Sequence, residues 1–563
     1  MISQDTLAAI ADLLYPDITE TPEDIFARYP QRNVPEGAII TRFAPSPTGF
    51  VHIGTIYIAL IGRMLTWQTQ GTLILRIEDT DQQRKLEEGV SEIVNSLHAF
   101  GIPFDEGVVQ ADPIVERGNY GPYQQSDRKH IYHVFAKNLV ASGMAYASFQ
   151  TEEELAEIRR QQERQGEKFG YYGPWAKDRS LTLDEIKARL DAGLPFVIRM
   201  RADYPTSETI VVEDAIRGTI EMPANDQDFV LIKSDGLPTY HFAHVVDDTT
   251  MRVNLILRAD EWLSTLPLHV QLFRAAGLPL PTFAHIAPIG KMDGNSKRKL
   301  SKRKDPEAAV SYYLEAGYPR QAILEYLLNI ASSSFEEWRT ANPTAPLADF
   351  ALRLENMSPS VSLFDQDKLD SISKNLIALY SAQEVYDAVL AWAQSYDPAL
   401  EQLLTADPAY ATSVFSIDRG GDSPRKDLAK WSEVKQTFGF FFDPIFEQSI
   451  QQGFDMPNVG AAEIIRIADH LVESVANLPD KETWMQGMRD FSLALGFAPT
   501  RQLFKSEPGK FKGQFGDVMM VSRVALSNQR FTPDLYDIIS VMGEERVTRR
   551  MEAAKQWAAS RQG

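Results

Sequence analysis

The N-terminal part of the chain alternates between β-prone and helical patterns of apolar residues. Residues 38–43 are β-prone and run into a proline-rich turn at 45–49, after which apolar residues recur at helical spacing over 52–65. A second β-prone run at 72–77 precedes a second helical pattern at 87–97. This repeated order of strand, loop and helix predicts the first half of a parallel α/β sheet.

The pattern becomes irregular between about residues 112 and 225 and then returns. The irregular interval contains two helical patterns and an aromatic loop with glycines, at 131–141, 152–164 and 169–175. β-prone runs at 229–232 and 253–257 are expected to restore the α/β order. We therefore expect an inserted domain that splits the sheet. Beyond Pro306 nearly every segment has amphipathic helical spacing, so the C-terminal part is predicted to be all-α.

Composition agrees with a folded protein of several domains. The 563 residues exceed the length of a single domain, which is roughly 100 to 200 residues. Hydrophobic residues make up 44% and charged residues 24%, as in soluble globular proteins. Neither a secretory signal nor a bilayer-spanning run is expected. The chain has no cysteine, which excludes disulfides and thiolate zinc sites and fits a reducing compartment, so a cytoplasmic location is expected.

The net charge of −20 argues at first against a nucleic-acid partner, because binding phosphates requires lysine and arginine at the contact surface. The basic residues, however, are clustered. One cluster comprises Lys291, Lys297, Arg298, Lys299, Lys302, Arg303 and Lys304, and another Arg501, Lys505, Lys510 and Lys512. Such clusters on an acidic body can bind RNA, although each could equally be a solvated loop.

Polar side chains gather where the predicted strands end. They are Arg42, Ser46, His52 and Gly54 after the first strand, Arg76 and Glu78 after the second, and Arg258 and Glu261 after a later one. Ligands of open parallel sheets bind at these carboxyl ends. A helix that begins near His52 would offer backbone N–H groups to a phosphate, and Gly54 would let a nucleotide approach the backbone. Taken alone, however, a proline-rich turn before a helix is more often structural than catalytic.

Two sequence strings favour the catalytic interpretation of this turn over the structural one. Residues 42–49 read RFAPSPTG and precede His52-Ile53-Gly54-Thr55, and residues 299–303 read KLSKR. Together they resemble the signature of bacterial glutamyl-tRNA synthetases, with that family's versions of the HIGH and KMSKS motifs. Between them, in family order, stand RIEDTD at 76–81, PTY at 238–240, VVDD at 245–248 and RADEW at 258–262. The resemblance is clear over 38–328 and returns faintly at 521–550.

The resemblance implies an enzyme that joins L-glutamate to tRNA through a glutamyl-adenylate, with AMP and pyrophosphate as products. It assigns the chemistry to His52, Gly54, Lys299, Ser301 and Lys302, and contacts with ATP also to Glu261, Leu300 and Arg303. Such transfers are catalysed mainly by positioning and by stabilising charge on phosphate oxygens, so Mg²⁺ is expected beside ATP. His52 as a hydrogen-bond donor and Lys302 as a mobile point charge suit this task.

For the amino acid, the resemblance implies a pocket formed by Arg42, Ala44, Ser46, Glu78, Tyr240, His244 and Arg258. Arg42 and Arg258 can hold the side-chain carboxylate, and Glu78 can hold the α-ammonium group. Arg258 would select glutamate, because glutamine would leave a buried cation unpaired. Many family members have asparagine where His244 stands, which is a departure from the pattern. The zinc site of some relatives is not expected, because the chain lacks cysteine, and no other metal site is expected.

The implied fold is a Rossmann-like class I α/β catalytic domain with an inserted α+β domain, followed by an all-α anticodon-binding region. The expected parts are an N-terminal extension at 1–37, the two catalytic halves at 38–111 and 226–296, an acceptor-stem-binding insertion at 112–225, a stem-contact domain with the KMSKS-like loop at 297–378, and two helical anticodon-binding subdomains at 379–475 and 476–563.

Expected partners are ATP, L-glutamate and tRNA(Glu), with no membrane, and a monomer is expected. The sequence leaves open whether tRNA(Gln) is also charged. A glutaminyl-tRNA synthetase is one alternative, disfavoured by the string at 44–48 and by Arg258. A non-catalytic RNA-binding relative is another, and it would predict loss of His52, Gly54, Lys299 or Lys302, all of which are present.

Overall fold

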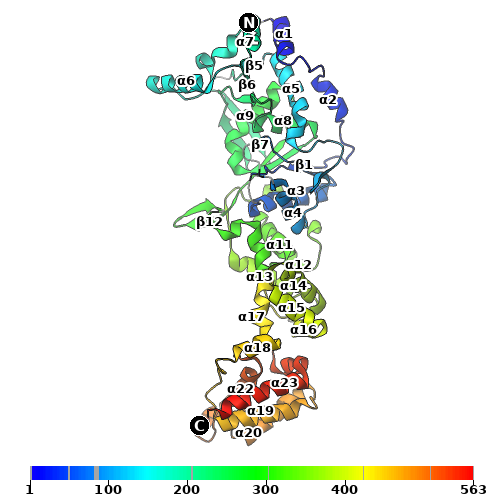
Figure 1. Ribbon diagram of the computed structural model, residues 1–563, viewed down its shortest axis with the longest axis vertical. Coiled ribbons are helices and arrows are strands. Elements are labelled where there is room, and N and C mark those ends of the chain that lie inside the picture. Colours follow the sequence, from blue (N-terminus) through cyan, green and yellow to red (C-terminus); the bar gives the residue numbers. More distant parts are fainter. Residues whose placement is uncertain are drawn as a thin grey trace. The chain divides into compact units, whose positions relative to one another are not determined.

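The computed structural model of the chain describes residues 3–48, 51–81, 86, 88–203, 207–301, 303–421, 424–507 and 509–561. These residues form two units, Met1–Tyr312 with Leu324–Asp365 and Tyr313–Ile323 with Gln366–Gly563. Strands and helices alternate in the first unit, whereas the second is built from helices (Figure 1). The predicted change from α/β to all-α is therefore confirmed.

The parallel sheet predicted near the N-terminus is present. Strands β1 (Ile40–Phe43), β2 (Thr72–Leu75) and β3 (Glu106–Ala111) are parallel, and β4 (Ile114–Arg117) is antiparallel to β3. Helix α3 (Ile53–Thr69) connects β1 to β2, and α4 (Gly89–Ala99) precedes β3. All four residues of β1 and of β2 are buried, as expected for parallel strands covered on both faces.

The second half of the sheet meets the first at β1. Strands β10 (Leu255–Ala259) and β11 (Thr282–Ile286) are parallel, and they follow α8 (Tyr240–Thr250) and α9 (Leu266–Ala275) respectively. The Asn254 N–H donates to the Ile40 carbonyl at 3.0 Å, and the Thr41 hydroxyl donates to the Leu255 carbonyl at 2.8 Å. The carboxyl ends of β1 and β10 therefore lie side by side, at the point where chain order reverses and ligands bind in such sheets.

The inserted segment contributes to two sheets. Its own sheet contains β5 (Ala145–Ser148), β6 (Val197–Met200) and β9 (Val230–Ile232), and its helices are α5 (Lys129–Ala141), α6 (Glu152–Gln165) and α7 (Leu183–Asp191). The run at 229–232 was expected to return to the parallel sheet, and this prediction is wrong, because β9 pairs antiparallel with β6. Conversely, β7 (Thr209–Asp214) pairs parallel with β11 and carries β8 (Gly218–Pro223) as a hairpin partner.

The N-terminal extension lies against both the insertion and the catalytic half. Its helices are α1 (Gln4–Leu14) and α2 (Pro22–Arg28). The Lys137 ammonium on α5 donates to the Ile18 carbonyl at 2.6 Å, while Arg32 forms an ion pair with Glu106 on β3 at 2.7 Å. Arg252, after α8, donates to the Tyr29 carbonyl at 2.6 Å. The extension therefore ties two parts of the first unit together.

After β11 the chain forms a small three-stranded sheet and several helices. A hairpin of β12 (Ile289–Asp293) and β13 (Ser296–Lys299) carries β14 (Ser362–Leu363) on its edge. The helices of this stretch are α10 (Val310–Ala316), α11 (Arg320–Ala331) and α12 (Ser334–Ala341).

The second unit is helical and has a continuous apolar core. Its helices are α13 (Gln366–Ile377), α14 (Ala382–Tyr396), α15 (Pro398–Ala406), α16 (Pro408–Phe415), α17 (Val434–Phe438), α18 (Asp443–Ser449), α19 (Ala461–Val475), α20 (Lys481–Ala494), α21 (Arg501–Ser506), α22 (Phe515–Ser527) and α23 (Leu535–Ala559). Helix α23 is interrupted at Gly543, whose φ of 71° is one that glycine readily adopts. In the described part of the chain, no helix has both the length and the apolarity to cross a membrane.

Candidate active site

The start of α3 forms one wall of the site. His52 caps this helix, and its Nδ1 accepts the Gly54 N–H at 3.0 Å. A neutral imidazole that accepts at Nδ1 carries its proton on Nε2, so Nε2 is the donor atom, and the contact of His52 with ATP stays a prediction. The His52 backbone also forms an antiparallel bridge with Ala309. That bridge brings the chain just after the KMSKS-like string next to the start of α3.

Gly54→Ala is expected to reduce the rate of adenylate formation by about tenfold or more, because misplacing a catalytic group by a fraction of an ångström is costly. A Cβ at Gly54 would lie 3.2 Å from His52 Nδ1 and would press on the imidazole. Stopped-flow or pyrophosphate-exchange rates would measure this effect. The matched control is Gly487→Ala in α20, where a Cβ would meet nothing within 4 Å. Equal rates for Gly54→Ala and wild type would contradict the role of His52.

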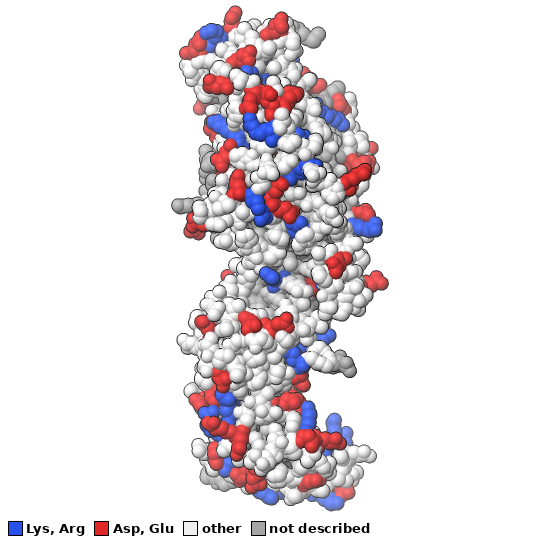
Figure 2. Space-filling model, turned by 90° about the vertical axis from the view of Figure 1, so that its right-hand side faces the viewer, with Lys and Arg blue, Asp and Glu red and all other residues white. Residues whose placement is uncertain are grey.

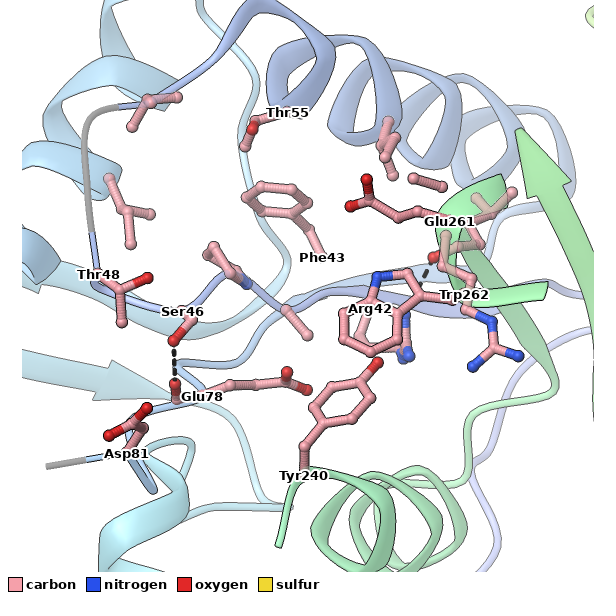
Figure 3. Close-up of a pocket in the computed structure, with 18 of the residues that line it drawn as sticks. Arg42, Phe43, Ser46, Thr48, Thr55, Glu78, Asp81, Tyr240, Glu261 and Trp262 are labelled. Carbon is pink, nitrogen blue, oxygen red and sulfur yellow. Dashed lines mark hydrogen bonds between the residues drawn. The ribbon is translucent and has the colours of Figure 1, made fainter. Parts of the chain in front are cut away.

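A cavity of about 600 Å³ opens beside this wall at the carboxyl ends of the strands (Figure 3). It is lined by Arg42, Phe43, Ala44, Pro45, Ser46, Thr48, Val51, Thr55, Ile58, Glu78, Thr80, Asp81, Ile93, Tyr240, Leu257, Arg258, Ala259, Glu261 and Trp262. All of the side chains predicted to contact glutamate line it except His244. His52 and Gly54 stand at the start of α3, between Val51 and Thr55 of the lining.

Glu78 and Tyr240 face each other across this cavity. Figure 3 shows the Glu78 side chain and the Tyr240 hydroxyl entering the same space from different elements. The Ser46 hydroxyl donates to the Glu78 carbonyl at 2.9 Å and fixes the loop after β1 to the end of the second strand. Burial raises the pKa of the Glu78 carboxyl, against the effect of Arg76 and Arg42. The Tyr240 ring stacks on Trp262, with centroids 4.4 Å apart, which holds the tyrosine in place.

Beneath the cavity lies a buried network of balanced charges. Asp248 accepts from Arg42 Nε at 3.0 Å and from Arg76 Nη1 at 2.6 Å. Arg76 also pairs with Glu78 at 3.1 Å, and Asp247 pairs with Arg128 at 2.6 Å. Burial would raise the pKa of Asp248, but Arg42 and Arg76 hold it well below its ordinary value. In this network every guanidinium has a carboxylate partner.

His244 belongs to this network and not to the cavity wall. It is fully buried, and its Nδ1 lies 3.0 Å from both Arg42 Nη2 and Asp248 Oδ2. Burial lowers its pKa to about 3, so the imidazole is neutral at ordinary pH. His244 therefore contacts Arg42 and does not line the cavity, and its direct contact with glutamate stays a prediction.

Arg258 differs from the arginines of this network, because no carboxylate of the described residues pairs with it. Its Nε donates to His285 Nε2 at 2.9 Å, and its Nη1 donates to His269 Nδ1 at 2.8 Å. Its Nη2 is buried and finds no hydrogen-bond partner among the described residues. Burial lowers the pKa of Arg258 to about 10, an effect that Tyr240 partly offsets. A buried cation of this kind, on the cavity wall, is suited to a carboxylate ligand.

The KMSKS-like segment begins on β13. Lys299 Nζ lies 2.6 Å from Glu261 on the cavity wall, and the Ser301 N–H donates to Asp305 at 2.8 Å. Leu300 is buried, Arg303 is exposed, and Lys302 lies outside the described residues. Of the basic cluster, Arg298 pairs with Asp305, and Lys291 pairs with Glu307. On the face shown in Figure 2, basic and acidic side chains are intermingled.

Comparisons with known proteins show the family to which the chain belongs. Residues 38–371 match the family model described as tRNA synthetases class I (E and Q), catalytic domain, and residues 498–555 match an anticodon binding domain. A glutamate–tRNA ligase from Clostridium perfringens is 45% identical over 543 residues, covering 96% of this chain and 99% of that protein. One from Sorangium cellulosum is 40% identical, covering 94% and 97%. The chain belongs to the class I glutamate–tRNA ligases.

A solved structure supports the same conclusion about the fold. The glutamate tRNA ligase of Elizabethkingia meningosepticum, in complex with its amino acid, aligns with a TM-score of 0.70 at 26% identity. The alignment covers 92% of this chain and 99% of that one. The family and the Rossmann-like class I fold expected from the sequence are confirmed.

Several residues of the ligase site were not identified from the sequence. They are His269 and His285, which both contact Arg258, and Asp214, which contacts His285. Only the position of His285 gave a signal, because an imidazole inside the apolar run 283–286 is a buried polar group that needs partners. The described residues include no group of three or more His, Asp or Glu side chains that could hold a metal ion.

Proposed function

We propose that the cavity holds glutamate and the α-phosphate of ATP together, so that the α-carboxylate attacks phosphorus and pyrophosphate leaves. The overall reaction follows from the family: the chain is a glutamate–tRNA ligase that uses ATP to attach glutamate to tRNA. The observation that carries the assignment of the pocket is Arg258, a guanidinium only 4% exposed that has histidines, and no carboxylate of the described residues, as partners.

In this arrangement the glutamate side chain points to Arg258, with Arg42 beside it. Both guanidiniums can present N–H groups to the carboxylate, and its negative charge offsets the buried positive charge. Glu78 accepts from the α-ammonium group, and the Tyr240 hydroxyl closes the pocket next to it. The α-carboxylate is then left facing the start of α3, where ATP binds.

The ATP side depends on α3 and the KMSKS-like segment. The Nε2–H of His52 and the N-terminus of α3 stabilise negative charge on the phosphates. Glu261 and Lys299 hold each other at the cavity edge, which suits Glu261 to a ribose or adenine contact. Lys302, assigned from the sequence, adds a cation as the phosphates separate. Mg²⁺ enters as part of the ATP substrate, because it is bound mostly by phosphates and water in such reactions.

The assignment of the other parts is proposed from the sequence pattern and the family. The insertion at 112–225 is assigned to the acceptor stem, the part at 297–378 to contact with the stem, and the helical parts at 379–475 and 476–563 to the anticodon. The match of residues 498–555 to an anticodon binding domain supports the last of these. We further propose a monomer that works in the cytoplasm, where charged tRNA is used, with tRNA(Glu) as substrate. The charging assay below decides whether tRNA(Gln) is a second substrate.

The test is a charging assay with purified full-length protein, tRNA, ATP and either glutamate or glutamine. We expect glutamyl-tRNA with tRNA(Glu), no product after EDTA removes Mg²⁺, and recovery when excess Mg²⁺ is restored. Charging with glutamine in preference to glutamate would show a glutaminyl enzyme instead. Binding of tRNA without any charging would show a non-catalytic relative. Comparing tRNA(Glu) with tRNA(Gln) in the same assay decides the range of tRNA substrates.

A further inference from the structure

Arg258 is held by a chain of hydrogen-bonded side chains that come from three strands and from the helices α8 and α9. On one side, Arg258 Nε on β10 donates to His285 Nε2 on β11, and His285 Nδ1 lies 2.6 Å from Asp214 Oδ2 on β7. On the other side, Arg258 Nη1 donates to His269 Nδ1 on α9, and His269 Nε2 lies 3.0 Å from His241 Nδ1. All four partners are protein side chains, and the two that touch Arg258 are imidazoles.

The hydrogen bonds fix the tautomer of each imidazole. Asp214 accepts the backbone N–H groups of Ile216 and Arg217, each at 3.0 Å, so its carboxylate is anchored. Although burial raises it, hydrogen bonds from His285 and the backbone lower the pKa of Asp214 overall. An ionised carboxylate can only accept, so His285 carries its proton on Nδ1 and offers the lone pair of Nε2 to Arg258. His269 offers the lone pair of Nδ1 and donates from Nε2 to His241.

The imidazoles beside Arg258 are neutral. Burial lowers the pKa of His241 to about 4 and places the pKa of His269 well below its ordinary value. Burial also lowers the pKa of His285, and the bond to Asp214 only partly opposes this. The Asp214 charge is separated from the guanidinium by the whole imidazole ring of His285. Arg258 therefore has its position fixed without having its charge cancelled.

We propose that His269 and His285 are positioning residues that keep Arg258 an uncompensated cation, and that this neutral support sets the preference for glutamate over glutamine. The inference rests on the proposed function, in which Arg258 meets the side-chain carboxylate of the substrate. A carboxylate in place of either histidine would hold the guanidinium equally well. It would also neutralise the guanidinium, so that the substrate carboxylate would gain much less from binding there than it does now.

The other arginine of the pocket shows the contrast. Arg42 already pairs with Asp248, so its positive charge is balanced by a carboxylate of the protein. A neutral amide such as that of glutamine can accept hydrogen bonds from Arg42 at little cost. The same amide next to Arg258 would leave the buried positive charge without a counter-charge. Discrimination between glutamate and glutamine therefore depends on Arg258, and through it on the neutrality of His269 and His285.

The decisive experiment compares His269→Asn with His269→Asp in the full-length enzyme. In both variants the side-chain Oδ1 can replace Nδ1 as the acceptor for Arg258, and both lose the link to His241. The two side chains have nearly the same shape, so the main difference between them is the negative charge of Asp. We expect the KM for glutamate to stay within about threefold of wild type in His269→Asn and to rise by about tenfold or more in His269→Asp, with the KM for ATP unchanged in both. The ratio of kcat/KM for glutamate to that for glutamine should fall in His269→Asp alone.

The pair His285→Gln and His285→Glu repeats the comparison at the Nε side, because Oε1 reaches the position of Nε2. This second pair decides the matter if thermal unfolding shows that His269→Asp does not fold. Equal glutamate KM values and equal selectivity within a folded pair would overturn the proposal. Arg258→Gln separates this outcome from failure of the proposed function: if that variant also keeps the wild-type KM for glutamate, Arg258 does not bind the substrate at all.

Discussion

Arg258→Gln is expected to lower kcat/KM for glutamate by about 10²- to 10³-fold, because leaving one member of a buried charge pair alone costs about 3–5 kcal/mol. In the variant, the substrate carboxylate would enter a pocket of the same shape without its counter-charge. The effect should appear mainly in the KM for glutamate, with the KM for ATP close to wild type. Steady-state charging over a range of glutamate concentrations measures both values.

The same substitution should not destabilise the ligand-free protein. Burial lowers the pKa of Arg258 to about 10, which shows that the folded state disfavours its positive charge. Removing this charge offsets the loss of hydrogen bonds to the histidines, so the Tm of the variant should equal or exceed that of wild type. Adding glutamate should raise the Tm of wild type much more than that of the variant. Arg530→Gln, which breaks an exposed pair with Asp455, is the matched control and should change neither property.

Asp248→Ala is expected to lower the free energy of unfolding by about 3–5 kcal/mol. Asp248 is buried and accepts hydrogen bonds from the guanidiniums of both Arg42 and Arg76. Without it, two buried positive charges lose a shared partner, and Arg42 loses the group that orients it toward the cavity. Urea unfolding monitored by tryptophan fluorescence would measure the change. Asp191→Ala, which removes an exposed pair with Lys187, should stay within about 0.5 kcal/mol of wild type.

The pH dependence of this loss has a definite sign. The pKa of Asp248 in the folded protein is well below 3.8, its ordinary value, so its contribution is fully present above pH 3.8. The contribution disappears only as the pH falls through the lower, folded-state pKa. The difference in stability between wild type and Asp248→Ala should therefore be constant over about pH 5 to 8 and shrink in stronger acid. A difference that shrinks near neutral pH would mean that the carboxyl is not held in its ionised form by Arg42 and Arg76.

Local patterns predicted most of the secondary structure but not which strands pair. The helical spacing at 52–65 and 152–164 corresponds to α3 and α6. Each helix has a local start signal, because His52 caps α3 and Thr151 and Glu154 form a capping box on α6. The β-prone run at 229–232 does form a strand, yet it joins the sheet of the insertion. Strand β7, with its strict alternation of exposed and buried residues, was not predicted at all. Alternation shows that one face is buried but does not identify the neighbouring strand.

The candidate site shows the same division between local and long-range information. The strings at 42–46 and 258–262 each place pocket residues close together in sequence, so a resemblance could find them. The partners that set their charge lie far away along the chain: Asp248 is 206 residues from Arg42, and Asp214 is 71 residues from His285. No periodicity links such positions. His244 illustrates the limit, because its place in the sequence suggested a ligand contact, whereas its burial behind Arg42 is visible only in the fold.

Strand β7 has a practical consequence for protein engineering. Because Asp214 lies on this strand, the inserted segment also holds His285, which supports the proposed amino-acid pocket. Exchanging the whole of residues 112–225 for the corresponding segment of another synthetase would remove the anchor of His285 along with the surface that is proposed to contact RNA. A chimera meant to change only tRNA contacts should keep Thr209–Asp214 and its hairpin partner Gly218–Pro223 and place its splice points outside them.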